Sequence, residues 1–485
     1  MTSRQPIVVI LGHVDHGKTT LLDYIRTTKV ADKEAGGITQ SIGAYQAEFK
    51  GKKLTFIDTP GHAAFSKMRS RGVGVADIVV LVVAGDDSVQ PQTIESIKHI
   101  QAAQVPFVVA INKTDKPDAN VEVVKAALTQ HEVFVEGYGG NTPFVLISGK
   151  TGEGVDKLLE TILLLAELEE LPYFPDSQLE APVIEAKIDS RKGALVSVIV
   201  KSGTLHIGDM ICTETATAKV RALFNDLGVN IIKATPGTPV QILGFQTLPT
   251  VGETIVPGAG VPITPGVKGA HTPGVSDVPS IDPLDKHLNI ILKADNSGSL
   301  EAIKGSFAPE VKCITNDTGQ ISESDVLHAR ATDSIILGFN TKVSSSVLKL
   351  AQAEGVTIKS YKIIYELLEY IEKKILKLME PTIDEDELGS ATIIKVFEIN
   401  GDHIAGSRID TGRFEVGDTI HLKRGDISKD ARIRGIRIGK NEAKKVELGV
   451  ECGIFLSPNL DVHEKDVIIA YKKKLDDIWT TNYRN

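Results

Sequence analysis

The sequence has little cysteine, no long apolar run and no excess of positive charge. Its three cysteines, Cys212, Cys313 and Cys452, are too few and too widely spaced for a disulfide framework or a cysteine-rich metal cluster. No apolar run reaches the roughly 18 residues of a membrane-spanning helix. A formal net charge of −9 argues against a simple nucleic-acid coat protein. We therefore expect a multidomain globular protein of a reducing cytoplasm, with no secretory signal and no membrane partner.

A glycine loop near the N-terminus is the most informative feature that is present. Residues 12–19 read GHVDHGKT, follow the apolar run 7–11 and precede apolar residues at helical spacing. In this context the pattern G-x-x-x-x-G-K-[ST] is typical of a loop whose backbone N–H groups surround a polyphosphate. Lys18 would place a positive charge on the β- and γ-phosphates, and Thr19 would offer a hydroxyl to Mg²⁺.

A carboxylate and a histidine follow a second predicted strand. Residues 54–57 are apolar and run into the sequence DTPGH at 58–62. Asp58 would lie behind the waters of Mg²⁺, the N–H of Gly61 would meet a γ-phosphate, and His62 would orient an attacking water. The alternatives are an ordinary strand-end turn for Asp58 and a solvated loop histidine for His62.

Two later strand ends carry groups suited to a purine base. The apolar run 107–111 is followed by NKTD at 112–115, and the run 144–147 is followed by SGK at 148–150. Asp115 can accept hydrogen bonds from N1–H and the 2-amino group of guanine, a pair of donors that adenine lacks. The stem of Lys113 can cover the purine face, and backbone N–H groups after Ser148 can hold the guanine O6. The motifs together predict a GTP site, although turns are often rich in Asn and Asp.

The segment 34–40, EAGGITQ, lies between the first two motifs. Its glycines and hydroxyl suit a loop that becomes ordered around Mg²⁺ and a γ-phosphate. Thr39 is the candidate second hydroxyl ligand of the ion, and a plain flexible loop is the alternative.

These motifs resemble those of the translational GTPases, and the wording GGITQ at 36–40 and DTPGHAAF at 58–65 resembles bacterial translation initiation factor 2. The resemblance implies ribosome-activated hydrolysis of GTP to GDP, with Mg²⁺ bound and His62 as the catalytic residue. It also implies that Val14 and Ile38 form an apolar gate beside His62. The usual S-A-K of the family has Gly149 at its centre here. The residues expected to bind GTP are Gly12, Asp15, His16, Gly17, Lys18, Thr19, Thr20, Asp58, Gly61, Asn112, Lys113, Asp115, Ser148, Gly149 and Lys150, and those expected to bind the metal are Thr19 and Thr39.

Periodicity and composition divide the chain into several parts. Alternating strands and helices predict a doubly wound α/β domain first, and β-rich runs with turns predict barrels. Between Pro257 and Pro283, 11 of the 27 residues are proline or glycine, which favours a linker. The expected parts are an α/β P-loop GTPase domain at 1–172, a β-barrel at 180–256, the linker at 257–283, a small α/β domain at 284–360, a connecting helix at 361–382 and a second β-barrel at 388–475.

An internal repeat supports two related barrels. Residues 203–211 (GTLHIGDMI) match 412–420 (GRFEVGDTI), and 218–221 (AKVR) match 431–434 (ARIR). Each copy is expected to form a turn, a short strand, a Gly-Asp turn and another strand. Chance similarity of turn chemistry is the alternative.

The C-terminal barrel carries a local basic stretch. Residues 423–445 contain nine basic and three acidic side chains. Such a stretch can bind phosphate despite an acidic total, and a solvated barrel face is the alternative. The resemblance implies that this barrel holds the formylmethionyl end of initiator tRNA, near the sequence GVECG at 449–453. The expected contacts are Arg434, Arg437 and Lys440 on charge, and Glu451, Cys452 and Gly453 on resemblance; a buried apolar role is the alternative for Cys452.

Some features depart from the family pattern. We expect the chain to lack the family's long N-terminal extension. Ser407 replaces a cysteine of the family, and Arg437-Ile438-Gly439 replaces a basic-aromatic stretch.

The resemblance implies a monomeric protein whose partners are both ribosomal subunits and initiator tRNA. The protein would promote binding of this tRNA to the small subunit and then the joining of the subunits. The alternatives are a translational GTPase of different duty, which the domain order disfavours, and a nucleotide-gated RNA-binding scaffold without hydrolysis.

Overall fold

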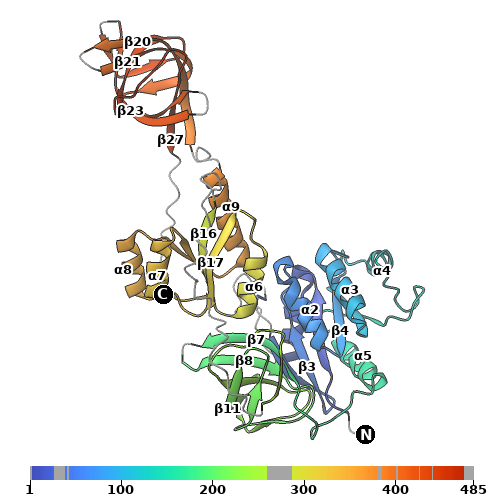
Figure 1. Ribbon diagram of the computed structural model, residues 1–485. Helices are drawn as coiled ribbons and strands as arrows, with labels where there is room; N and C mark the ends of the chain where they lie inside the picture. Colours follow the sequence, from blue (N-terminus) through green and yellow to red (C-terminus); the bar gives the residue numbers. More distant parts are fainter. Residues whose placement is uncertain are drawn as a thin grey trace. The chain divides into compact units, whose positions relative to one another are not determined.

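The computed structural model describes residues 3–26, 39–40, 43–189, 191–258, 287–379, 385–399, 402–424, 427–439 and 441–473. The chain forms two compact units, Met1–Glu372 and Lys373–Asn485, and Figure 1 labels many of their helices and strands. The linker expected at 257–283 lies almost wholly outside the described residues. Among the helices described, none is long and apolar enough to cross a membrane.

A six-stranded sheet with helices on both faces forms the first part of the N-terminal unit. The order is β2-β3-β1-β4-β5-β6, in which only β2 runs antiparallel to its neighbour. The strands are β1 (Ile7–Gly12), β2 (Gly43–Phe49), β3 (Lys52–Asp58), β4 (Ile78–Ala84), β5 (Phe107–Asn112) and β6 (Phe144–Leu146). The helices are α1 (Lys18–Arg26), α2 (Ser66–Val75), α3 (Pro91–Ala103), α4 (Val121–Thr129) and α5 (Val155–Leu168), with 3-10 helices η1 (Val14–His16) and η4 (Ala63–Phe65).

Burial explains why these strands read as continuous apolar runs. Every residue of β1 and β4 is buried, because α1 and α5 cover one face of the sheet and α2 covers the other. The apolar runs at 7–11, 54–57, 107–111 and 144–147 correspond to β1, β3, β5 and β6, whereas β2 has too mixed a composition to have been predicted. A parallel order places the carboxyl ends of β1, β3, β4 and β5 at one edge of the sheet.

The next part of the same unit is a closed barrel of six antiparallel strands. The strands follow one another in the order β10-β15-β7-β8-β14-β11, and β11 pairs with β10 to close the ring. The strands of this region are β7 (Ala181–Asp189), β8 (Gly193–Ile199), β9 (Leu205–His206), β10 (Met210–Cys212), β11 (Thr217–Phe224), β12 (Asn230–Ile231), β13 (Lys233–Ala234), β14 (Pro239–Phe245) and β15 (Thr254–Pro257).

A four-stranded parallel sheet with three helices completes the N-terminal unit. Its strand order is β17-β16-β18-β19, and α9 follows it in the chain. The elements are β16 (Leu288–Ala294), α6 (Ser297–Gly305), β17 (Val311–Thr318), α7 (Glu323–Ala331), β18 (Ile335–Phe339), α8 (Ser345–Glu354), β19 (Ile358–Tyr361) and α9 (Ile364–Met379). Ser322, with its hydroxyl and its backbone N–H both paired to Asp325, begins α7 as a capping box.

The C-terminal unit is a second closed barrel of six antiparallel strands. Its ring runs β20-β27-β22-β23-β26-β21 and closes through pairing of β21 with β20. The strands are β20 (Glu385–Ile399), β21 (Asp402–Glu415), β22 (Thr419–Arg424), β23 (Ile427–Ile438), β24 (Asn441–Ala443), β25 (Lys445–Glu447), β26 (Glu451–Ser457) and β27 (Val467–Lys473). The expected fold class, an α/β domain with two barrels and a small α/β domain, is confirmed.

The repeated sequence has the same local structure in both barrels. Gly208 and Gly417 both have positive φ values, of 97° and 104°, which few residues other than glycine adopt. The N–H of Gly208 donates to the carbonyl of Val220 at 2.8 Å, and the N–H of Gly417 donates to that of Ile433 at 2.9 Å. The Asp that follows each glycine accepts a backbone N–H from three residues earlier, at 2.7 Å in both copies. The repeat is therefore a structural one, and not chance turn chemistry.

Candidate functional site

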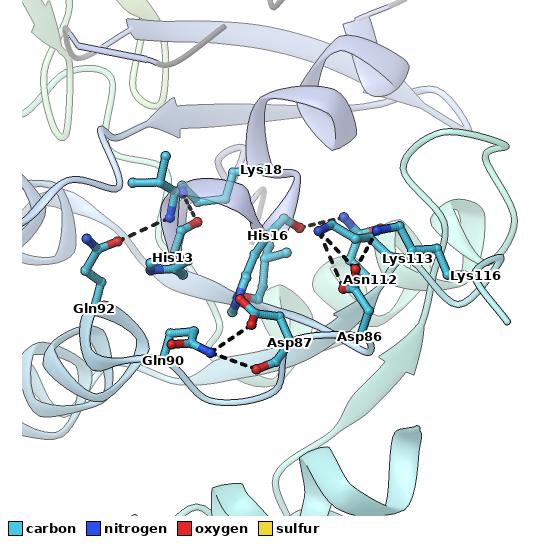
Figure 2. Close-up of polar contacts among 12 residues, drawn as sticks. His13, His16, Lys18, Asp86, Asp87, Gln90, Gln92, Asn112, Lys113 and Lys116 are labelled. Atoms are coloured by element: carbon cyan, nitrogen blue, oxygen red, sulfur yellow. Dashed lines mark hydrogen bonds and ion pairs between the residues drawn. The ribbon is translucent and has the colours of Figure 1, made fainter. Parts of the chain in front are cut away.

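Loops at the carboxyl ends of the parallel strands are tied together by Asn112, the last residue of β5. Its amide nitrogen donates to the carbonyl of His16 at 2.8 Å, and its amide oxygen accepts the N–H of Gly149, also at 2.8 Å. Figure 2 shows this side chain reaching the glycine loop. Asn112 thus joins three of the predicted motifs, which identifies it as a brace between the loops.

The glycine loop ends at the first turn of α1. Gly17 has a φ of 79°, and a Cβ there would lie 2.6 Å from the amide nitrogen of Asn112, so both conformation and space require glycine. Lys18 is only 4% exposed, and its ammonium donates to the carbonyl of His13 (Figure 2). Burial lowers the pKa of Lys18 to about 8, against the opposing charge of Asp58. A cation at a helix N-terminus, with backbone N–H groups around it, suits a polyphosphate.

His16 contributes to this loop through its backbone. Its ring is fully buried, with Nδ1 3.3 Å from the carbonyl of Val82 and Nε2 3.3 Å from a carboxylate oxygen of Asp87. Burial, the largest cause, lowers the pKa of His16 to about 4, so the ring is neutral at pH 7. The ring therefore packs against β4 and the loop that follows it.

Three oxygen-bearing side chains converge beside Lys18. The hydroxyls of Thr19 and Thr39 lie 2.9 Å apart, and the hydroxyl of Thr39 lies 3.4 Å from a carboxylate oxygen of Asp58. Two hydroxyls and a carboxylate are hard ligands of the kind Mg²⁺ prefers. The residues present therefore fit a magnesium ion, with Thr19 and Thr39 as ligands and Asp58 beside them, as the sequence predicts.

Gly61 lies directly against the glycine loop, and His62 follows it in the chain. A Cβ on Gly61 would come within 2.6 Å of the Lys18 ammonium and 2.9 Å of the Val14 backbone, so only glycine allows this approach. His62 accepts the N–H of Ala64 on Nδ1 at 2.9 Å, and burial, aided by the charge of Arg69, lowers its pKa. The ring is then neutral with its proton on Nε2, which can donate to a water but cannot accept a proton from it.

The residues predicted to contact a base also meet one another. The hydroxyl of Ser148 donates to the carboxylate of Asp115 at 2.7 Å. Lys113, at a φ of 63°, lies 3.5 Å from Asp86, which also pairs with Lys116. These ion pairs hold the lysine stem in place (Figure 2) and lower the pKa of Asp86, although its burial opposes the shift. A Cβ on Gly149 would lie 3.1 Å from the N of Leu21, so the alanine usual in the family would be tight here.

Other predicted residues are placed with less detail. Asp15 and Thr20 are exposed at the glycine loop and the first turn of α1, and Lys150 is exposed after Gly149. Val14 is half-buried, and its N–H donates to the side chain of Gln92 at 3.2 Å. Ile38, the expected partner of Val14 in the gate, lies outside the described residues.

Several residues outside the predicted motifs contact them. Arg69 is fully buried and donates to the carbonyls of Pro60 and His62. It shares the buried face of α2 with Gly72 and Val73, so an arginine at apolar helical spacing was the available signal. Near the start of α9, Gln40 pairs with the carbonyl of Lys362 at 2.8 Å and the N–H of Ile364 at 3.0 Å. The ring of Tyr365 lies 4.2 Å from that of His62, centroid to centroid.

A second candidate site is a cavity of about 520 Å³ in the C-terminal barrel. Its walls include Ile394, Phe397, Ile404, Ser407, Cys452 and Phe455, together with the predicted Arg437, Glu451 and Gly453. Burial raises the pKa of Cys452 to about 11, so its sulfur is an apolar wall group and no thiolate.

The basic side chains around this cavity are partly neutralised. Arg437 pairs with Glu442 at 2.7 Å, and its guanidinium lies 5.3 Å from the ring centre of Phe455. Arg434 is exposed and lies 6.0 Å from the same ring centre. Lys440 lies outside the described residues.

Comparisons with known proteins agree with this geometry. Residues 3–167 match the sequence model of the elongation factor Tu GTP binding domain, 178–258 that of elongation factor G domain 2, and 280–372 that of translation-initiation factor 2. The chain is 42% identical to translation initiation factor IF-2 of Petrotoga mobilis, over 97% of this chain and 71% of the relative. The IF-2 of Dehalococcoides mccartyi is also 42% identical, over 97% and 82%.

Other relatives are longer than this chain. A solved structure also matches most of the chain, but with a low TM-score. The chain spans 50% of the IF-2 of Desulforamulus reducens and 44% of that of Lachnoclostridium phytofermentans. GDP-bound aIF5B from Aeropyrum pernix matches 97% of this chain and 92% of its own at 25% identity, with a TM-score of 0.46. The assignment therefore depends on the sequence relatives: the chain belongs to the translation initiation factor IF-2 family of translational GTPases.

Proposed function

We propose that this chain binds GTP with Mg²⁺ and hydrolyses it on the ribosome while it promotes binding of formylmethionyl initiator tRNA to the small subunit and subunit joining. The proposal is supported chiefly by five residues that converge at the carboxyl-end edge of the parallel sheet. They are Lys18, Thr19, Thr39, Asp58 and Gly61. The proposed place of action is the cytoplasm, where these partners are found.

The triphosphate would bind along the glycine loop. Lys18 and the N–H groups at the start of α1 would neutralise its charge, and Gly61 would donate its N–H to the γ-phosphate. Mg²⁺, held by Thr19 and Thr39, would neutralise charge on the phosphates when bound. At the other end of the site, Asp115 would accept two hydrogen bonds from guanine while Ser148 fixes the carboxylate.

Hydrolysis would require a water placed in line with the γ-phosphate. His62, neutral with its proton on Nε2, would hold that water by donating a hydrogen bond to it. The nearby guanidinium of Arg69 is occupied by Pro60, His62 and Glu95 and cannot reach a phosphate without losing them. The free protein should therefore hydrolyse GTP slowly, and the large ribosomal subunit would complete the site.

The cavity of the C-terminal barrel would take the formylmethionyl group. A methionine side chain is apolar and flexible, and the walls formed by Phe397, Phe455 and Cys452 suit it. Arg437 at the rim would favour the adjoining phosphates, although Glu442 reduces its charge.

The deciding experiment measures GTP hydrolysis with and without ribosomes and charged initiator tRNA. Ribosomes should stimulate the intact protein strongly, and His62→Ala should lose most of that stimulation while it binds GTP normally. Near-normal turnover in that variant would remove His62 from the mechanism. A chain that binds GTP but hydrolyses none, with ribosomes present in single turnover, would instead be a nucleotide-gated scaffold.

Titration with formylated and unformylated initiator tRNA tests the second site. The proposal expects tighter binding of the formylated form, and Phe455→Ala should abolish the difference because it opens one wall of the cavity. Equal, weak affinity for both forms in the intact protein would reject the specific role of the barrel.

A further inference from the structure

Arg69 is the largest side chain in the described part of the chain that is buried completely. A buried charge is costly unless it is paired and hydrogen-bonded, so such a residue needs a specific reason. Nη2 of Arg69 forms an ion pair with Glu95 of α3 at 2.7 Å. The carboxylate of Glu95 also lies 3.3 Å from the ring of His99, so the anchor of the guanidinium is itself held in place.

The other end of the guanidinium grips the loop before α2. Nη1 of Arg69 donates to the carbonyl of Pro60 at 3.0 Å and also to the carbonyl of His62. These two carbonyls flank Gly61 on either side. One fully buried cation therefore holds the peptide group that precedes Gly61 and the one that follows His62.

The geometry of a trans peptide links the hydrogen bond between Arg69 and Pro60 to the nucleotide site. In a trans peptide the C=O and the following N–H point in opposite directions. Because the carbonyl of Pro60 points at Arg69, the N–H of Gly61 points away from it. The side of Gly61 from which a Cβ would project lies against Val14 and the Lys18 ammonium, where the γ-phosphate would bind.

We propose that Arg69, anchored by Glu95, is a positioning residue that aims the N–H of Gly61 at the γ-phosphate and sets the place of His62. The inference rests on the proposed function and deepens it. Arg69 makes no contact with the nucleotide. It acts through the backbone of residues 60–62, and it should favour GTP over GDP because only GTP has a γ-phosphate to meet Gly61.

The test compares the full-length protein with Arg69→Met in two assays. Affinity for a non-hydrolysable GTP analogue should fall about tenfold, the value of one hydrogen bond to a charged group, while affinity for GDP stays unchanged. Ribosome-stimulated turnover should fall about 100-fold, as expected for a small displacement of a reacting group. Arg69→Lys should lie in between, because one ammonium cannot reach both carbonyls and Glu95 in the same fork geometry.

Arg71→Met is the matched control on the same helix. Arg71 pairs with Glu301 of α6 at 2.6 Å, and within the described part of the chain it forms no hydrogen bond or ion pair with residues 60–62. The ratio of GTP-analogue to GDP affinity in Arg71→Met should therefore equal that of the intact protein. If Arg69→Met fails to fold, Glu95→Gln is the second variant, since it weakens the anchor at a side chain that is 28% exposed.

Each outcome decides the inference. Equal loss of affinity for GDP and for the analogue would show a purely structural role, and an unchanged ratio with unchanged turnover would show no role; either result overturns the inference and leaves the proposed function intact. An intact protein that neither binds the analogue nor hydrolyses GTP would overturn both.

Discussion

At the scale of single residues, the proposed recognition of the base would depend on a contact between two loops. Asp115 follows β5 and Ser148 follows β6, and the hydroxyl of Ser148 donates to the Asp115 carboxylate at 2.7 Å. This hydrogen bond removes rotamer freedom from the carboxylate before a base binds, which lowers the entropic cost of recognition.

Replacement of that carboxylate tests the base assignment. Asp115→Asn should reduce GTP affinity on the order of 100-fold, because the amide NH2 that replaces one carboxylate oxygen would face a hydrogen-bond donor of guanine. Affinity for xanthosine triphosphate should rise at the same time. Calorimetric titration with both nucleotides measures the change, and Asp118→Asn, an exposed carboxylate of the same loop, is the control. Unchanged GTP affinity in Asp115→Asn would contradict the assignment.

The buried ring of His16 should make the free energy of unfolding of the protein depend on pH. The pKa of its ring is lowered to about 4 in the folded protein, chiefly by burial, from an ordinary value of 6.5. The unfolded chain therefore binds a proton that the folded chain does not, and this contribution to stability, present above pH 6.5, is lost as the pH falls toward 4. The full effect is roughly 3 kcal/mol.

Urea unfolding at a series of pH values between 7 and 4 checks this expectation. His16→Gln should flatten the fall in unfolding free energy over that range, even if the variant is less stable at pH 7. His206→Gln, at a ring that is 51% exposed, should leave the slope unchanged. An unaltered slope in His16→Gln would show that another group causes the pH dependence.

At the scale of elements, the first turn of α9 contacts both loops expected to respond to the γ-phosphate. Gln40 makes a two-point hydrogen bond with Lys362 and Ile364, and Tyr365 packs edge-on against His62. The helix is amphipathic, and Ile364, Leu367, Ile371 and Ile375 bury its apolar face. A shift of either loop would therefore change its contacts with the start of α9.

Loss of the Tyr365 ring should change the titration of His62. Because burial is the main cause of its lowered pKa, Tyr365→Ala should raise that pKa toward 6.5. NMR titration of the His62 ring measures the shift. Tyr361→Ala removes a ring that packs 5.7 Å from Tyr370, and it should leave His62 unchanged. The same pKa in both variants would mean that Tyr365 does not bury His62.

At the scale of the whole molecule, the chain consists of two compact units with separate cores. The nucleotide motifs belong to the first unit and the barrel cavity to the second. The described cores of the two units share no residue. The contacts of the nucleotide motifs should therefore form without the second unit, and the barrel cavity should form without the first.

Removal of the C-terminal barrel tests this independence. A chain that ends at Met379 should bind GTP with the affinity of the intact protein and should lose all affinity for formylmethionyl initiator tRNA. Fluorescent nucleotide binding and tRNA filter binding measure the two quantities. A large loss of GTP affinity in the shortened chain would show that the units depend on each other.

The sequence alone determined the parts whose physics is local. Continuous apolar runs identified the buried strands, glycine spacing identified the loop that must approach a phosphate, and repeated Gly-Asp turns identified two related barrels. The glycine loop and the segment 34–40 also led to the prediction that Thr19 and Thr39 bind Mg²⁺ with Asp58 behind its waters, and the three side chains do lie together; the metal site itself stays a prediction.

Only the tertiary structure determined which contacts form between residues of different elements, and which role each of these residues takes. The ring of His16 packs against β4, Asn112 braces two loops, and a buried Arg69 holds the loop of Gly61, and no motif in the sequence specifies these contacts. Burial and the meeting of residues far apart in sequence set these roles, because a side chain's charge state and partners depend on what surrounds it after folding.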